Sequence, residues 1–187
     1  MENFNTYCQE VDLSFCYDLL LSKGILRTYK KGDYFIRTNQ QSKFIGLIKS
    51  GYFKYSVTGT DGEEHITGFA FQKSIVGDYF SIMKDTMSLT NIIATTDSEV
   101  YLCQKEVLKA FLADNLPQNL QISNALFYQA YTQFLDMHRL TPKERYLSII
   151  TKCPDILQTI TVKEMASFLN ITPTHLSRLR KEITFSK

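Results

Sequence analysis

The spacing of hydrophobic residues changes twice along the chain, and each change indicates a different kind of structure. Residues 2–22 carry apolar positions that favour one or two short helices. After Gly24 the apolar positions gather in short runs separated by turns rich in Gly and Asp, a pattern typical of an antiparallel sandwich or roll. At Lys105 the helical spacing returns. We expect the strands at residues 34–36, 44–48, 52–57, 65–71, 91–95 and 99–103.

A long helix is predicted from about Pro117 to His138, between short helices at residues 106–113 and 143–152. Apolar residues recur along it at alternating steps of four and three, with Ser123 as the polar member, so they share one side. Such a seam suits a two-stranded coiled coil, and it equally suits a helix packed on the strands. The sequence leaves both open. The seam is formed by Leu116, Leu120, Phe127, Ala130, Phe134 and Met137.

The C-terminal region contains the start signals of two further short helices. Thr161 and Glu164 have the spacing of a capping box, in which each residue satisfies a backbone N–H at the helix start. Thr172 is a second cap, and the Pro173 that follows it is well tolerated as a first helical residue. Asn170, in the turn between them, tolerates the left-handed backbone that a tight corner needs. Helix, short turn and helix is the arrangement that lays a second helix in the major groove of DNA.

The second of these helices has one apolar and one polar face. Its apolar face is predicted to contain Leu176, Leu179 and Ile183. Arg can pair with guanine, Thr can contact a base edge and Lys can contact phosphate, so the other face suits DNA. An ordinary amphipathic hairpin with a solvated basic face is the alternative. The polar face consists of Thr174, Ser177, Arg178 and Lys181, with His175 and Arg180 on its flanks.

Composition and charge narrow the class of protein. The chain has 187 residues, of which 44% are hydrophobic and 21% charged, an ordinary globular composition. Residues 140–187 contain eight Lys or Arg against four Asp or Glu, a net charge of +4, whereas the whole chain carries +2. This basic region suits a polyanion such as DNA. The sequence has no apolar run of membrane-spanning length and no N-terminal signal pattern, so we expect a cytoplasmic protein without a membrane partner.

Residues that could support catalysis or hold a metal are scattered. The sequence contains no Gly-rich phosphate loop, nucleophile elbow or HExxH motif. The four cysteines lie far apart, which favours buried, reduced thiols over disulfides, a metal centre or an iron–sulfur cluster. His65 beside Glu63 and Glu64 could mimic a cupin metal site, but such sites usually need two or three histidines. We therefore expect no enzyme activity, no metal and no cofactor.

Several segments carry a resemblance to a known family. They are Gly51-Tyr52 with Asp61-Gly62-Glu63-Glu64, Val76-Gly77-Asp78-Tyr79-Phe80, Asp97-Ser98-Glu99-Val100 and residues 160–181. Over nearly its whole length the chain resembles the Crp/Fnr superfamily of transcription regulators. The resemblance implies an α+β fold with an antiparallel β-roll like a cyclic-nucleotide-binding jelly roll, a long dimerisation helix and a C-terminal winged helix-turn-helix. It places the effector domain at residues 1–113, the dimerisation helix at 114–139 and the DNA-binding domain at 140–187.

The resemblance also assigns DNA contacts residue by residue. It implies phosphate contacts from Thr161, Lys163 and Thr172, and base or groove contacts from Pro173, Thr174, His175 and Arg178. Arg178 keeps the family's usual residue, whereas Pro173 and Thr174 replace an Arg and a Glu that many members use to read bases. The preferred DNA sequence should therefore differ. Because few residues follow Ile183, we also expect a truncated wing.

The family's effector pocket is implied at Gly77, Asp78, Ile82, Lys84 and Ser88. Members that bind cyclic AMP use a Gly-Glu pair and an Arg-Ser or Arg-Thr pair after the Gly-Asp turn, and the Arg holds the phosphate. Here Ile82 stands where the Glu should be, Ser88 lies near the Arg position, and the loop is shorter. We therefore expect no tight binding of cyclic AMP.

These features together predict a dimeric, sequence-specific DNA-binding transcription regulator of the Crp/Fnr type that cyclic AMP does not control. The expected partners are double-stranded DNA with a pseudo-palindromic site, a second copy of the chain, RNA polymerase and an unknown small-molecule effector. The alternative is a protein-binding or ligand-sensing module that has kept the roll and lost DNA binding.

Overall fold

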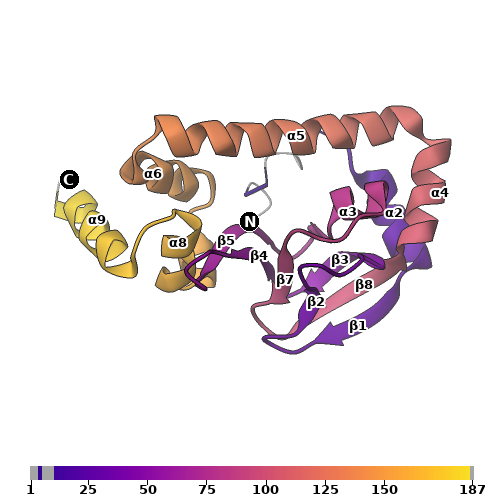
Figure 1. The fold of residues 1–187 in the computed structure, drawn as a ribbon, viewed down its shortest axis with the longest axis horizontal. Coiled ribbons are helices and arrows are strands. Elements are labelled where there is room, and N and C mark those ends of the chain that lie inside the picture. Colours follow the sequence, from indigo (N-terminus) through magenta and orange to yellow (C-terminus); the bar gives the residue numbers. More distant parts are fainter. Residues whose placement is uncertain (1–3, 6–10, 186–187) are drawn as a thin grey trace.

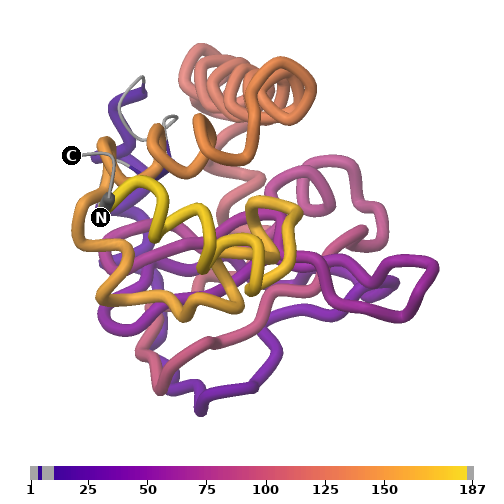
Figure 2. The backbone as a smooth tube through the Cα atoms, turned by 90° about the vertical axis from the view of Figure 1, so that its left-hand side faces the viewer, coloured from indigo at the N-terminus to yellow at the C-terminus, as the bar shows by residue number. Residues whose placement is uncertain are grey.

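The computed structural model describes residues 4–5 and 11–185, and it has an α+β fold with two unlike halves. Figure 1 shows a roll of β-strands at one end of the molecule, small helices at the other end, and one long helix that runs above both. In the view of Figure 2, turned by 90°, the C-terminal helices lie in front of the strands and the long helix lies above them. The fold class predicted from the sequence is confirmed.

Two four-stranded antiparallel sheets form the roll. The first has the order β1-β8-β3-β6, with bounds Ile25–Tyr29, Ser98–Gln104, Phe44–Ser50 and Ile75–Val76. The second has the order β2-β7-β4-β5, with bounds Tyr34–Ile36, Asn91–Ala94, Phe53–Thr58 and Glu64–Ala70. Apolar side chains including Phe53, Ile92 and Val100 are fully buried in the core of the roll. The strand order leaves β5 at an edge of the second sheet.

β4 and β5 form the hairpin that the turn residues predicted. Their loop is closed by a hydrogen bond from the Gly62 N–H to the Gly59 carbonyl (3.0 Å) and by another from the Gly59 N–H to the Glu63 carbonyl (2.9 Å). Gly62 has a φ of 82°, which residues with a side chain rarely adopt. The sequence therefore fixes this turn locally.

In the part of the chain that the structure describes, three short helices complete the roll: α2 (Ser14–Lys23), α3 (Tyr79–Lys84) and α4 (Lys105–Asp114). Their apolar faces form a second core cluster, in which Ile82 and Leu112 are fully buried. The predicted helical region at residues 2–22 thus overlaps α2, and its residues 2–3 and 6–10 lie outside the described part of the chain.

The long helix α5 runs from Leu116 to Arg139 and packs on the roll by a side next to its apolar seam. Ile122 and Ala125 are buried on the packed side, whereas the large seam residues are more than half exposed, Phe127 most of all at 70%. The helix therefore packs on the roll, but not through the large side chains of its seam. Ser123, which the spacing assigned to the seam, has its hydroxyl 2.8 Å from that of Tyr79 on the roll.

Four helices form the C-terminal half: α6 (Pro142–Lys152), α7 (Ile156–Thr159), α8 (Val162–Phe168) and α9 (Pro173–Phe185). α8 begins with the predicted capping box of Thr161 and Glu164. Asn170, in the turn before α9, has a φ of 55°, the left-handed conformation expected there. The helix-turn-helix geometry predicted from the sequence is confirmed.

Three elements of the roll were not predicted. β1 has almost no buried residue, so its side chains show no alternation, and β6 has only two residues. Both exist because they pair with strands distant in sequence, β1 with β8 and β6 with β3. α3 has six residues, too few for a recognisable helical period.

Candidate nucleic-acid interface and internal cavities

α9 is held against α8 by its apolar face. Leu176 and Leu179 are buried in a cluster with Met165 and Ala166 of α8, and Ile183 packs against the same cluster. The Thr172 hydroxyl accepts a hydrogen bond from the His175 N–H (3.1 Å), which caps the start of α9 as predicted. The helix therefore presents its remaining side to the surface (Figure 2).

The polar face of α9 is exposed along its whole length. The Ser177 hydroxyl donates to the Pro173 carbonyl (2.9 Å), which leaves its oxygen able to accept another hydrogen bond. The guanidinium groups of Arg178 and Arg180 and the ammonium of Lys181 give this face its positive charge. All six predicted residues lie on it: Thr174, His175, Ser177, Arg178, Arg180 and Lys181.

The predicted phosphate-binding residues stand at the starts of the two helices. Thr161 and Thr172 are the N-caps of α8 and α9, and Lys163 is exposed in the first turn of α8. The Thr161 hydroxyl accepts from the Glu164 N–H (3.2 Å) with its oxygen, so its proton remains available to a phosphate. Helix N-termini favour anions, because unpaired N–H groups and the helix dipole meet there.

The exposed seam of α5 contains one residue that the spacing did not single out. Tyr131 is half exposed and stacks on Phe127, with ring centroids 5.9 Å apart. One turn further, the ring of Phe134 meets that of His138 at 4.7 Å. A step of four residues from Phe127 could have identified Tyr131, since such positions share a helix face.

A cavity of about 290 Å³ lies between the roll and α5. Gly77 and Asp78, two of the five predicted effector residues, line it. The Asp78 carboxylate accepts from the Ser81 N–H (3.0 Å) and so caps α3. Most of the wall is apolar, and its polar groups include Tyr55, Thr67, Thr90, Gln129 and Gln133, none of which the sequence analysis identified.

The other three predicted effector residues lie elsewhere. Ile82 is fully buried in the core around α2 and α4, and Ser88 is buried with its hydroxyl donating to the Thr90 carbonyl (2.8 Å). Lys84 is exposed at the end of α3. None of the three lines the cavity.

A second cavity, of about 480 Å³, lies between β5, the C-terminal part of α5, α6 and α8. Phe4 and Ile66 form part of its wall, together with Phe134 and Met137 of the α5 seam. This cavity therefore borders both halves of the molecule.

The three cysteines of the described residues are free and buried. Burial raises the pKa of the Cys16 thiol to about 12 and also raises the pKa of Cys103 and Cys153, so these thiols stay protonated near neutral pH. Cys8 lies outside the described residues. Glu64 pairs with Lys54 and Ser56, and His65 lies 3.7 Å from Asp61, so neither of them forms the cupin-like site considered above.

No group of three or more His, Cys, Asp or Glu side chains among the described residues could hold a metal ion. None of the helices in this part of the chain combines the length and the hydropathy needed to cross a membrane.

The chain is similar to known proteins in one domain and in its whole fold. Residues 26–115 match the cyclic nucleotide-binding domain. Comparison with curated proteins gave no match. FixK2 from Bradyrhizobium japonicum is 14% identical, with 87% of this chain and 85% of that chain covered and a TM-score of 0.76.

Two further solved structures share the fold. The regulator CLP of Xanthomonas campestris, described as responsive to c-di-GMP, is 13% identical, with 92% of each chain covered and a TM-score of 0.68. The catabolite activator protein of Thermus thermophilus is 16% identical, with 91% of this chain and 83% of that chain covered and a TM-score of 0.57. At sequence identities this low, the structural similarity shows a common fold and nothing more.

Proposed function

We propose that this chain, whose residues 26–115 match the cyclic nucleotide-binding domain, is a dimeric, sequence-specific DNA-binding transcription regulator of the Crp/Fnr type. The observation that carries the proposal is the exposed polar and basic face of α9, displayed by a helix-turn-helix whose caps and turn are all in place. The protein acts in the cytoplasm and by binding rather than by catalysis.

The apolar seam of α5 supports dimerisation. Its Leu, Phe and Met side chains are more than half exposed, so each would gain a little over half of the roughly 1.5–3 kcal/mol that complete burial of such a side chain is worth, and a second copy offers the same seam. Pairing of two α5 helices puts one α9 on each side of a two-fold axis. We place the effector domain at residues 1–113, the dimer helix at 114–139 and the DNA-binding domain at 140–187.

Two sets of residues contact DNA, one at the base edges and one at the phosphates. Arg178 and Thr174 read base edges in the major groove, with Pro173, His175 and Ser177 beside them. Thr161, Lys163 and Thr172 bind the phosphates, with Arg180 and Lys181. In the dimer the two α9 helices would lie about one turn of B-DNA apart, roughly 34 Å, on a pseudo-palindrome.

The cavity beside Gly77 argues against control by cyclic AMP. A cyclic nucleotide carries an anionic phosphate, and an anion buried without a cation is strongly unfavourable. Among the described residues that line this cavity there is no Lys, Arg or His, and the one ionisable carboxyl, that of Asp78, would repel an anion. An effector suited to this cavity is small, uncharged and mostly apolar.

Selection of duplexes from a random DNA pool tests the proposal, with wild type, with Arg178→Ala and with cyclic AMP added. We expect a palindrome to be enriched by wild type without nucleotide and to be lost with the variant. Enrichment only with cyclic AMP would contradict the argument from the cavity. A folded protein that enriches nothing would favour the alternative, a roll-bearing module that binds other proteins.

A further inference from the structure

The DNA-binding half shares a hydrophobic core with the roll of its own chain. Tyr52, Ile66, Phe69 and Phe71 of the roll lie in the same buried cluster as residues of the C-terminal half. Those C-terminal residues are Tyr146, Cys153, Ile156, Ile160, Met165, Ala166, Leu169, Leu176 and Leu179. The orientation of α9 is therefore fixed against the roll within one chain, in addition to its connection through α5.

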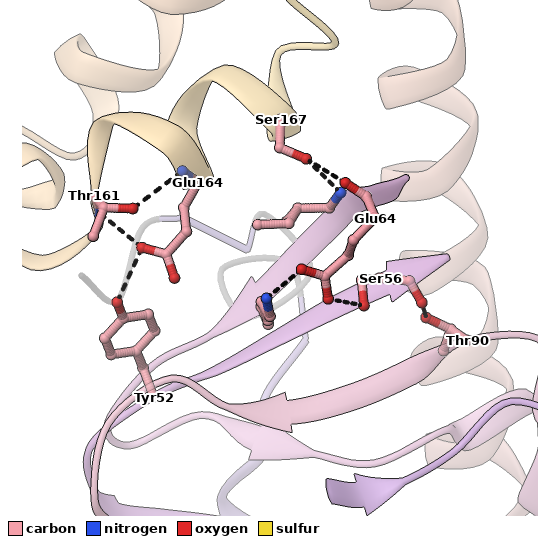
Figure 3. A network of polar contacts seen from close by, with 9 residues as sticks. Tyr52, Ser56, Glu64, Thr90, Thr161, Glu164 and Ser167 are labelled. Carbon is pink, nitrogen blue, oxygen red and sulfur yellow. Dashed lines mark hydrogen bonds and ion pairs between the residues drawn. The ribbon is translucent and has the colours of Figure 1, made fainter. Parts of the chain in front are cut away.

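α8 covers the free edge of β5 with polar contacts as well. The Ser167 hydroxyl accepts a hydrogen bond from the Ile66 N–H (2.9 Å) and donates to the Glu64 carbonyl (3.3 Å) (Figure 3). These are the backbone groups that an edge strand leaves unpaired. One side chain of α8 thus substitutes for a neighbouring strand.

A second polar contact reaches the capping box of α8 (Figure 3). The Tyr52 hydroxyl lies 3.2 Å from the Thr159 carbonyl and 3.4 Å from the Glu164 carboxylate, the two acceptors for its proton. The same carboxylate accepts from the Thr161 N–H (2.7 Å). Burial and the nearby Glu164 raise the pKa of Tyr52, so the hydroxyl remains a donor.

Phe4 and Asn5, here named the N-terminal clasp, complete this junction. The Phe4 ring meets Phe69 at 5.7 Å and Phe71 at 5.4 Å on the roll, and it meets Phe168 of α8 at 5.5 Å. A single side chain therefore packs against both halves of the molecule. Aromatic pairs of this kind stabilise beyond the area that they bury.

Asn5 ties the clasp to the third part of the molecule. It is buried, and its side-chain amide donates to the Phe69 carbonyl (3.0 Å) while its oxygen accepts from the Gln129 amide of α5 (3.3 Å). Asn5 lines the cavity beside Gly77, and Phe4 lines the second cavity. The clasp thus contacts the roll, α5 and the helix-turn-helix at the point where the two cavities approach each other.

We propose that Phe4 and Asn5 are positioning residues for DNA recognition: the clasp holds α8 on β5 and so sets the spacing and angle of the two α9 helices in the dimer. This inference rests on the proposed function. The inference goes beyond the proposed function because it assigns the control of half-site spacing to a contact within one chain, made by residues that are not proposed to touch DNA.

The test compares duplexes that carry the selected palindrome with its half-sites one base pair closer, unchanged or one base pair further apart. We expect wild type to prefer its own spacing by about tenfold or more, since a shifted half-site misaligns one recognition helix. Phe4→Ala should reduce this preference to about threefold or less, within the range of measured long-range couplings. Binding of the palindrome by Phe4→Ala should still depend on Arg178, because the substitution leaves the contacts to bases intact.

Three further variants make the result specific. Phe4→Leu keeps an apolar side chain and should restore most of the preference. Asn5→Ala removes both hydrogen bonds of the Asn5 side chain and should lower the spacing preference even with Phe4 in place. Phe80→Ala makes the same substitution at an exposed ring of α3 and should leave the preference unchanged. If Phe4→Ala and Asn5→Ala both fold, bind DNA and keep the spacing preference of wild type, the proposal is overturned.

A measurement without DNA separates this inference from the proposed function. Hydrogen exchange at the Ile66 amide and along α8 should be faster in Phe4→Ala than in wild type and unchanged in Phe80→Ala. Exchange unchanged by the loss of Phe4 contradicts the clasp even if DNA is bound. Faster exchange in a protein that binds no duplex supports the clasp as the element that holds α8, and the failure then belongs to the proposed function.

Discussion

At the scale of single residues, local contacts hold the start of α8 and the turn before α9 in place. The capping box of Thr161 and Glu164 and the left-handed Asn170 depend on neighbours within a few positions, so residue types alone identified them. The effector residues, in contrast, were inferred from the family pattern across a loop whose length differs here. Two of them, Ile82 and Ser88, are buried in the protein core and do not line the cavity.

Arg178 is exposed in the middle of the polar face of α9, where a guanidinium can pair with guanine. Arg178→Ala should cost about 1–3 kcal/mol of binding to the selected site and relax the preference at one base pair. Titration of duplexes that carry each base pair at that position measures both effects. Unchanged affinity and unchanged preference would show that other residues read the bases.

Lys181 is exposed one turn further along α9, beyond the start of the helix that enters the groove. As a phosphate contact it should contribute to binding of every sequence alike. Lys181→Ala should therefore weaken specific and random duplexes by similar factors and reduce the slope of log affinity against log salt by about 1. A loss confined to the selected site would identify Lys181 as a base contact instead.

Glu64 gives a pH dependence of stability. Burial alone would raise its pKa, but hydrogen bonds from Lys54 and Ser56 and the charges of Lys54 and Lys163 leave the pKa below its ordinary value of 4.5. A lowered pKa in the folded protein means that the stabilisation is complete above pH 4.5 and is lost as the pH falls below it.

Lys54→Met removes the cationic partner of Glu64. Wild type should be more stable than this variant at pH 7, and the difference should shrink as the pH falls from 5 to 3, measured by urea unfolding. Lys43→Met, at an exposed lysine, is the control, and its effect should not vary with pH in this way. A difference between wild type and Lys54→Met that is constant across this range would exclude a role for the Glu64 carboxylate.

At the scale of elements, segments with a clear local signal were predicted well. α5 has enough residues for a clear period, and its observed bounds, Leu116–Arg139, agree closely with the predicted residues 117–138. α8 has only seven residues and was identified by its capping box. β1, β6 and α3 depend on partners distant in sequence. The side of α5 that faces the roll could not be predicted from the sequence either, because it depends on how side chains from distant segments pack in the core clusters beneath the helix.

The exposed seam of α5 should control dimerisation. Phe127→Glu places a charge in the middle of the seam and should convert dimers to monomers at micromolar concentration, measured by sedimentation equilibrium. Gln121→Glu adds the same charge to an exposed position on another side of α5 and should leave the dimer intact. A wild type that is monomeric at all accessible concentrations, or a Phe127→Glu variant that remains dimeric, would exclude this interface.

At the scale of the whole molecule, the shared core explains why the sequence could not predict the junction between the halves. Tyr52 and Glu164 are separated by more than a hundred residues, and Phe4 reaches Phe168 from the other end of the chain. No local pattern encodes such contacts. They make the roll, the long helix and the DNA-binding half one connected structure.

The most direct test of the central claim is an anisotropy titration of the selected palindrome against a scrambled duplex of the same length. We expect wild type to bind the palindrome with two chains per duplex and at least about a thousandfold more tightly than the scrambled duplex. Arg178→Ala should lose most of that difference. Equal affinity of wild type for the two duplexes would contradict sequence-specific recognition by this helix-turn-helix.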